Sequence, residues 1–173
     1  ENKRDNFEWF CYVLFCKEYN KPFGIFRYKN QSAIETEPLE IGTEVIGFQS
    51  KFYDGTISSN HKDELIDTIA NAKRDYPNIT KIIFYINSEF GQGVGTREPK
   101  ALSDTNEKAS ELNIEIEWRL KSYFESPFVT IEQAIISSHF FENSSIIDTV
   151  FFFFLQTKSI LNIIHSDILF NNE

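Results

Sequence analysis

The stretch EVIGFQSKFY, residues 44–53, has the apolar and β-branched content of a buried β-strand, yet it contains a glutamine and a lysine. Because the side chains of a strand alternate between its faces, Gln49 and Lys51 project to one side and Ser50 to the other. A buried ammonium group is costly unless a carboxylate, a phosphate or a bound anion compensates its charge. The sequence therefore predicts anionic partners for Lys51 within the fold.

Two upstream acids are the candidate partners of this lysine. Glu35 lies in SAIETEP, residues 32–38, which has the composition of a short extended strand ending at Pro38. Glu8 lies in NFEWFCYVLFC, residues 6–16, which is apolar on almost all sides and predicts a helix buried over most of its surface. The helix dipole also stabilises a carboxylate early in a helix, so Glu8 has a purely structural explanation as well.

The order of these residues resembles the PD-(D/E)xK nuclease superfamily, and most closely its Mrr-like branch. In that family the first helix carries an acid, the second core strand a metal-binding acid, and the third strand an acid or glutamine two residues before a lysine. The residues at these positions are Glu8, Glu35, Gln49 and Lys51. The stretch GFQSKF, residues 47–52, is also similar to the N-terminal effector nucleases of bacterial antiviral STAND ATPases and related defence proteins. The resemblance extends to about residue 125.

The resemblance implies a metal-dependent endonuclease, a hydrolase that binds and cuts double-stranded DNA in antiviral defence. Mg²⁺, or Mn²⁺ in its place, would be held by Glu35 and Gln49, with Glu8 acting through water. Lys51 would stabilise charge on the phosphate or position the attacking water. Glu35 stands where aspartate is commoner and Gln49 where a carboxylate is, so the set offers fewer charged oxygens to a hard cation. Glu37 is expected at the strand end, outside the ligand set.

The charge of the chain has to be reconciled with DNA binding. A formal net charge of −9 argues against a bulk nucleic-acid binder, because non-specific affinity for DNA comes mainly from neutralised phosphates. Arg27 and Lys29 alternate on a predicted strand and would share a face, either toward DNA or simply toward solvent. Duplex affinity could also reside in an oligomer or in further domains. The alternative is a catalytically inactive interaction module that keeps the nuclease fold for oligomerisation.

The remaining pattern predicts an α/β protein with a restriction-endonuclease-like mixed β-sheet flanked by helices. The first helix is followed by three strands near residues 23–29, 32–36 and 44–53, which would form a meander. A helix from Asn60 to the Tyr76-Pro77 pair, a strand at 81–87, a helix from Asp104 to about Leu112 and a strand at 114–118 complete a domain over residues 1–128. The strand after each crossover helix is expected to be parallel to its neighbour.

Residues 129–173 predict a helical extension. Thr130 with Gln133 starts a helix that runs to about Phe141, and Ser144 or Ser145 starts another with apolar residues at helical spacing. A helical hairpin so rich in phenylalanine is typical of a core cover or a subunit interface. We expect this extension to link the nuclease-like domain to a sensor or ATPase domain, or to form a homo-oligomer.

Cysteine use and hydropathy predict a cytoplasmic protein without a membrane segment. Cys11 and Cys16 are five residues apart on the first helix, point to different faces, and so cannot pair with each other. Reduced core thiols are typical of the cytoplasm. No signal peptide is visible at the start of the sequence. The run FFFFL, residues 151–155, is too short to cross a bilayer.

Two further patterns resemble functional motifs but lack the residues or the spacing that these motifs require. The stretch GQGVGT, residues 91–96, follows a strand but lacks the GK[ST] ending of a phosphate-binding loop, so a flexible loop over the site is the better prediction. His61, His139 and His165 lack the spacing of zinc ligands.

Overall fold

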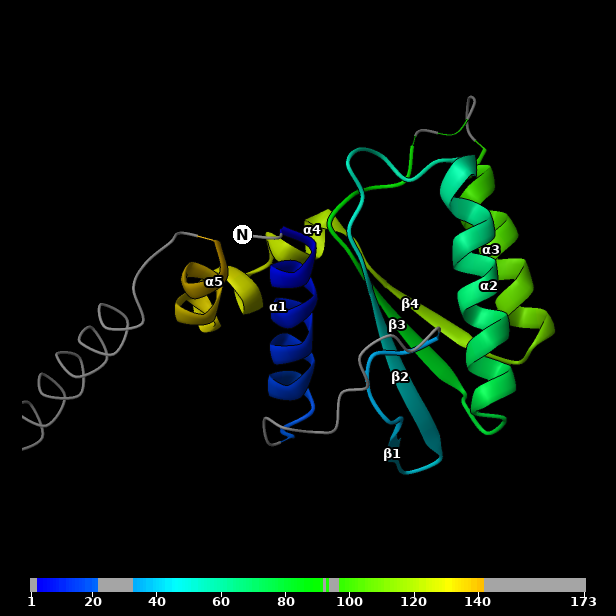
Figure 1. The fold of residues 1–173 in the computed structure, drawn as a ribbon, viewed down its shortest axis with the longest axis horizontal. Helices are drawn as coiled ribbons and strands as arrows, with labels where there is room; N and C mark the ends of the chain where they lie inside the picture. Colours follow the sequence, from blue (N-terminus) through cyan, green and yellow to red (C-terminus); the bar gives the residue numbers. More distant parts are fainter. Residues whose placement is uncertain (1–2, 22–32, 92, 94–96, 142–173) are drawn as a thin grey trace, which may run out of the picture. The chain divides into compact units, whose positions relative to one another are not determined.

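The structure, a computed structural model, describes residues 3–21, 33–91, 93 and 97–141 (Figure 1). The chain forms two compact units, Glu1–Glu132 and Gln133–Glu173, and each is described by itself. The elements of the first unit are α1 (Lys3–Glu18), β1 (Leu39–Ile41), β2 (Glu44–Lys51), α2 (Ser59–Asp75), β3 (Lys81–Ile86), α3 (Lys100–Glu111), β4 (Glu115–Arg119), α4 (Lys121–Phe124) and the π-helical turn η1 (Phe128–Glu132). The described part of the second unit contains α5 (Ala134–Phe141).

A mixed sheet lies at the centre of the first unit. Its strand order in the described residues is β1-β2-β3-β4. β1 is antiparallel to β2, whereas β2, β3 and β4 run parallel to one another. Parallel neighbours need a crossover connection, which α2 and α3 supply. The predicted α/β class, with a mixed sheet flanked by helices, is therefore confirmed.

Helices cover both faces of this sheet (Figure 1). α2 and α3 lie on one face, where Ile82, Phe84 and Ile86 of β3 join the hydrophobic core. α1 lies on the other face, where the ring centroids of Phe15 and Phe48 are 4.5 Å apart. β3 is buried on both faces, which explains the continuous apolar run of its sequence.

β4 shows the alternation that its sequence predicts. Ile116 and Trp118 pack against the core beside α2 and α3, and Trp118 stacks on Phe84 with ring centroids 5.1 Å apart. Glu117 and Arg119 alternate with them and project to the opposite face. One face of β4 is thus apolar and the other charged.

The predicted strand at residues 32–36 is wrong. Residues 33–36 form bends and irregular backbone, and the backbone N–H of Glu35 donates to the carbonyl of Phe48 in β2 at 2.9 Å. Pro38 has no N–H to continue such a ladder, and pairing with β2 passes to the short strand β1, which the sequence analysis missed. The predicted strand at 23–29 lies outside the described residues, so the predicted meander is not seen.

The predicted start of α3 is also wrong. The helix begins at Lys100 directly after Pro99, and Asp104 lies inside it, 3.6 Å from the ammonium of Lys62. Proline is favoured at the start of a helix, because its missing N–H would have no intrahelical acceptor there. Pro99 was therefore the signal for this start.

The predicted helix from Thr130 to Phe141 is seen as two pieces, η1 and α5, with Gln133 between them. The predicted second helix of the extension and its phenylalanine run lie outside the described residues. Of the helices in the described part of the chain, none has the length and hydropathy needed to cross a bilayer.

Gly47 lets the segment that carries Glu35 lie directly against β2. A Cβ atom added at Gly47 would be 2.9 Å from Cγ2 of Ile34 and 3.1 Å from Cδ1 of Ile79. Ile34 is fully buried and immediately precedes Glu35. The absent side chain at Gly47 therefore helps to set where Glu35 lies.

Gly47→Ala is expected to lower the free energy of unfolding by about 1–3 kcal/mol, because the new methyl group overpacks a buried contact. Urea denaturation measures this change. Gly91→Ala is the matched control, because its added Cβ would meet its nearest neighbour, the carbonyl oxygen of Ile57, at an ordinary 3.5 Å. Equal losses at the two glycines would contradict the close approach of Ile34 to β2.

Candidate functional site

The carboxylate of Glu35 is held beside β2 by donors from two neighbouring residues. Glu35 is 9% exposed, and its Oε1 accepts hydrogen bonds from Nε2 of Gln49 at 2.6 Å and from Oγ of Ser50 at 3.2 Å. The backbone N–H of Ser50 points at the same oxygen from 3.4 Å. Because Gln49 and Ser50 project to opposite faces of the strand, Glu35 lies at the edge of β2 between the two side chains. The structure thus brings together Glu35 and Gln49, two of the predicted site residues.

Gln49 presents its amide nitrogen, not its oxygen, to Glu35. The same Nε2 is 3.2 Å from the carbonyl oxygen of Ser50. A metal ion would be bound through the amide oxygen. For Gln49 and Glu35 to share a cation, the amide group would have to turn over, and the ion would replace the present hydrogen bond.

Lys51 pairs with an acid that the sequence analysis did not name. Its Nζ lies 2.8 Å from Oε1 of Glu64 on α2, and its side chain is 16% exposed. The other oxygen of Glu64 accepts a hydrogen bond from the hydroxyl of Tyr53 at 3.1 Å. The largely buried lysine is as predicted, but the ion pair in the structure is with Glu64, whereas Glu35 and Glu8 were expected.

A weak signal for Glu64 exists in the sequence. It immediately precedes Leu65, the first residue of the buried stripe of α2, and so flanks the helix face that packs on the sheet. A carboxylate at this border can reach the end of the preceding strand. Helical periodicity alone does not say which strand residue it meets, because that depends on how the crossover packs.

The charges around Lys51 shift two neighbouring groups. Partial burial raises the pKa of Glu64, but the hydrogen bond and charge of Lys51 outweigh it, so the net pKa lies below the usual value. Burial, followed by the charge of Glu64, raises the pKa of Tyr53 well above its usual range. Glu64 is therefore a carboxylate and Tyr53 a neutral hydrogen-bond donor at neutral pH.

Glu64→Gln is expected to cost about 0.2–1 kcal/mol of stability at pH 7, the range for a pair that is partly open to water. The lowered pKa of Glu64 means that this contribution is present above the ordinary carboxyl pKa of 4.5 and is lost as the pH falls through the lowered value. Urea denaturation of both proteins at pH 7 and at about pH 3 measures it. A difference as large in acid as at neutral pH would contradict the ion pair.

Glu8 lies on the helix that faces this region. Burial raises the pKa of Cys11 on α1, and the nearby charge of Glu35 raises it further, so Cys11 and Glu35 lie within electrostatic reach. Glu8 precedes Cys11 by three residues and is half-buried on the same side of α1, one turn closer to its N-terminus. Glu8 and Cys11 therefore share one side of α1.

The chemistry of these donors fits a hard divalent cation with several water ligands. Mg²⁺ is commonly bound by one or two carboxylates together with waters. Glu35 and the amide oxygen of Gln49 would bind it directly, and Glu8 through water. No group of three or more His, Cys, Asp or Glu side chains in the described ranges is arranged to hold a metal ion, so a cation at Glu35 would take most of its ligands from water.

The glycine-rich loop is associated with a different part of the molecule. A cavity of about 390 Å³ lies at the N-terminal ends of α2 and α3. Gly91 and Gly93 line it together with Arg97 and Lys100, and none of the four predicted site residues does. Other residues of this loop lie outside the described residues, so a loop over the site stays a prediction.

The sequence matches no protein-family model and no curated protein. The resemblance to the PD-(D/E)xK nucleases stays a prediction.

Proposed function

We propose that this chain is a metal-dependent endonuclease domain that hydrolyses phosphodiester bonds of double-stranded DNA, in defence against viruses. One observation carries the proposal: the buried carboxylate of Glu35 contacts Gln49 at the end of β2, two residues before the largely buried Lys51. This end of β2 is the carboxyl end of a parallel strand, where open α/β sheets commonly bind their ligands. A carboxylate, an amide oxygen and an ammonium group so close in sequence suit a metal-bound phosphate.

Each residue has a distinct task in this proposal. Bound Mg²⁺ would polarise the phosphoryl oxygen and lower the pKa of a water molecule. Glu35 and Gln49 hold the cation, and Glu8 orients one of its waters. Lys51 donates a hydrogen bond to a phosphate oxygen on which negative charge develops.

Glu64 prepares Lys51 for this task. The ion pair holds the ammonium group at the end of β2 in the free protein. A phosphate group would then compete with Glu64 for Lys51. The carboxylate of Glu64 is half exposed, so its displacement into water costs little.

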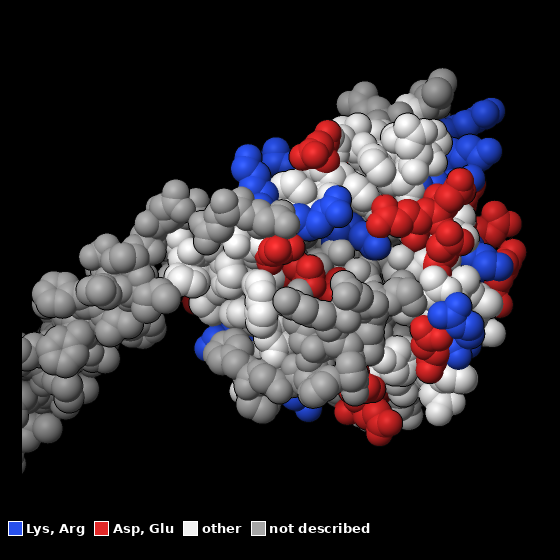
Figure 2. Space-filling view, viewed as in Figure 1, with Lys and Arg blue, Asp and Glu red and all other residues white. Residues whose placement is uncertain are grey.

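Binding of duplex DNA would need more than the described surface. Figure 2 shows acidic and basic side chains interspersed on the described part of one face rather than gathered into one basic surface. The net charge of −9 opposes non-specific attraction to DNA. We therefore propose that the nuclease acts as a homo-oligomer, or fused to a sensor or ATPase domain that supplies the affinity.

Cleavage of supercoiled plasmid by the purified chain tests the proposal, in Mg²⁺, in Mn²⁺ and in EDTA, with a forced dimer assayed in parallel. Cleavage should need the metal, and Glu35→Gln should reduce it by about 100-fold or more, the size of losing one stabilising group at a reacting centre. Glu37→Gln is the matched control, because Glu37 is exposed two residues away. Equal activity of the Glu35 and Glu37 variants, or a forced dimer that does not cleave the plasmid, would contradict the proposal.

The second candidate is a catalytically inactive module that uses the fold for oligomerisation. The hydrogen bonds of Glu35 with Gln49 and of Lys51 with Glu64 favour it, because these polar side chains already satisfy one another within the fold. This function predicts no heat of Mg²⁺ binding by calorimetry. It also predicts an oligomer whose stability does not change on replacement of Lys51.

A further inference from the structure

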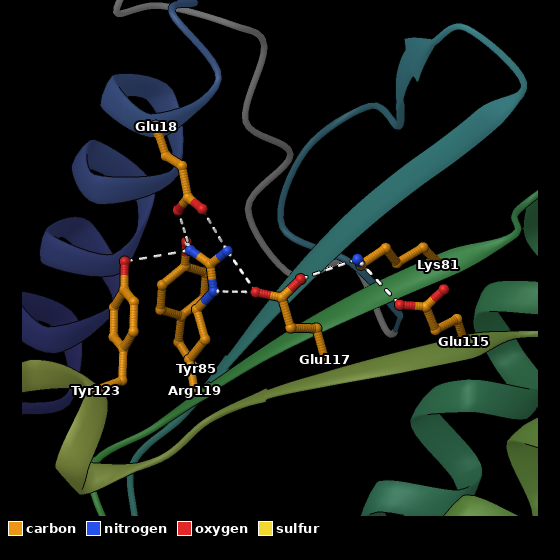
Figure 3. A network of polar contacts seen from close by, with 7 residues as sticks. All are labelled: Glu18, Lys81, Tyr85, Glu115, Glu117, Arg119 and Tyr123. Carbon is orange, nitrogen blue, oxygen red and sulfur yellow. Dashed lines mark hydrogen bonds and ion pairs between the residues drawn. The ribbon is translucent and has the colours of Figure 1, made fainter.

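A second polar cluster lies on the α1 face of the sheet and is centred on Arg119 of β4 (Figure 3). Arg119 is 4% exposed, although arginine is almost never fully buried without partners. Its guanidinium contacts two carboxylates and two phenol hydroxyls, from α1, β3, β4 and α4. These partners are Glu18, Tyr85, Glu117 and Tyr123.

The strongest contact joins β4 to the last residue of α1. Nη2 of Arg119 donates to Oε1 of Glu18 at 2.6 Å, and Nη1 donates to Oε2, so the pair is bidentate. Nε and Nη2 also donate to Oε1 of Glu117, at 2.8 and 2.6 Å. The planar fork of the guanidinium therefore fixes both the distance and the orientation of Glu18.

The two tyrosines complete the cluster from the sides. Nη1 of Arg119 is 2.7 Å from the hydroxyl of Tyr85 and 3.2 Å from that of Tyr123, and its guanidinium carbon lies 4.9 to 5.0 Å from both ring centroids. Burial raises the pKa of Tyr123 to about 12, and burial also raises that of Tyr85. Both phenols stay neutral at physiological pH, so they add no charge to the cluster of Arg119 and its two carboxylates.

Aromatic packing also joins α1 to the sheet and to the segment that follows β2. Phe15 packs on Phe48 with ring centroids 4.5 Å apart, and Phe7 packs edge-on to Phe52 at 5.7 Å. Apolar packing is non-directional and permits small sliding or rotation of a helix. The Arg119 contact is directional, and it acts at the C-terminal end of the helix that carries Glu8.

A helix transmits such a constraint along its length. Glu8 and Glu18 are ten residues apart, about 15 Å along α1 at 1.5 Å per residue. We infer that Arg119 is a positioning residue for the proposed nuclease site: by locking Glu18 it fixes how α1 docks on the sheet, and so where Glu8 stands relative to Glu35. This inference rests on the proposed function.

Three variants test the inference. Glu18→Gln weakens the ion pair between Glu18 and Arg119 from the α1 side. Arg119→Lys keeps the positive charge but loses the bidentate geometry of the guanidinium. Lys81→Met is the matched control, because Lys81 pairs with Glu115 and Glu117 at the outer side of the same cluster, at 3.1 and 2.9 Å (Figure 3). Glu18→Gln keeps the test valid should Arg119→Lys fail to fold.

Two measurements are made on each variant. The first is the rate at which a thiol reagent labels Cys11 and Cys16, which are both fully buried on α1 and report its docking without any need for activity. The second is the Mg²⁺ dependence of plasmid cleavage. We expect Glu18→Gln and Arg119→Lys to label about tenfold faster and to need about tenfold more Mg²⁺ for half-maximal cleavage, with the maximal rate largely recovered at saturation, as expected when metal binding alone is weakened. Lys81→Met should behave as the wild type in both measurements.

The outcomes separate the inference from the function on which it rests. Unchanged labelling in the Glu18 and Arg119 variants would show that the ion pair between Arg119 and Glu18 does not fix the docking of α1 on the sheet. Faster labelling with an unchanged Mg²⁺ requirement would show a structural contact only and would overturn the positioning role. A wild-type protein that does not cut DNA would instead overturn the proposed function, while the labelling rates would still report whether Arg119 docks α1.

Discussion

Replacing Lys51 with alanine is expected to reduce Mg²⁺-dependent plasmid cleavage by about 100- to 1000-fold, the usual loss when one stabilising donor is removed from a reacting centre. The free energy of unfolding should change by less than about 1 kcal/mol, because the partner Glu64 is half exposed and can be solvated. Cleavage kinetics and urea denaturation of the same preparations measure the two effects. A large loss of activity with a small loss of stability separates a chemical role from a structural one.

Lys62→Ala is the matched control for this variant. Lys62 also pairs with an acid, Asp104, at 3.6 Å, but it lies on α2 and bridges to α3, away from β2. Its replacement should leave cleavage unchanged. If Lys51→Ala instead unfolds the protein or cuts as fast as the wild type, Lys51 has no role in catalysis.

Arg119→Met is expected to lower the free energy of unfolding by about 2–3 kcal/mol, less than for a fully buried ion pair, because the side chains of Glu18 and Glu117 are 33% and 34% exposed and water can solvate them. Methionine fills similar space but removes the donor from the carboxylate of Glu18 and the hydroxyl of Tyr85, while Glu117 keeps its ion pair with Lys81. Burial by itself would lower the pKa of Arg119, but the contacts with Glu18 and its neighbours reverse the shift. The contacts with Glu18 and its neighbours therefore stabilise the charged guanidinium more than burial destabilises it.

Urea denaturation in low and high salt distinguishes this buried cluster from surface pairs. The loss at Arg119 should persist in 1 M salt, because a buried pair is poorly screened. Arg74→Met is the control, since Arg74 forms an exposed pair with Asp75, and stability should not change measurably. A loss at Arg119 that disappears in high salt would contradict its burial.

Most of the secondary structure of the first unit could be predicted from local pattern. The alternation of Ile116 and Trp118 with charged residues, and the continuous apolar run of β3, predict strands because burial follows the strand period directly. The failures occur where pairing depends on distant partners. Residues 33–36 look like a strand by composition, but they form bends and irregular backbone, with the N–H of Glu35 bonded to the carbonyl of Phe48 in β2, before Pro38 ends the pairing.

The candidate site could be predicted only in part, for the same reason. Two-residue periodicity places Gln49 and Lys51 on one face of β2 without any knowledge of the fold. That Gln49 meets Glu35 depends on the close packing of Ile34 against Gly47, which only the folded chain creates. The sequence analysis named Glu35 and Glu8 as partners of Lys51 and missed Glu64, because the position of α2 over the end of β2 is set by the packing of the crossover.

The sequence by itself determined the α/β class, the main helices and strands, and the faces on which their charged residues lie, because these features depend on neighbours a few positions apart. Tertiary structure alone decided that Lys51 pairs with Glu64, 13 residues away, and that Arg119 locks Glu18, 101 residues away. The physical reason is that a buried charge takes the opposite charge that packing brings within about 4 Å, and the order of residues along the chain does not encode that distance.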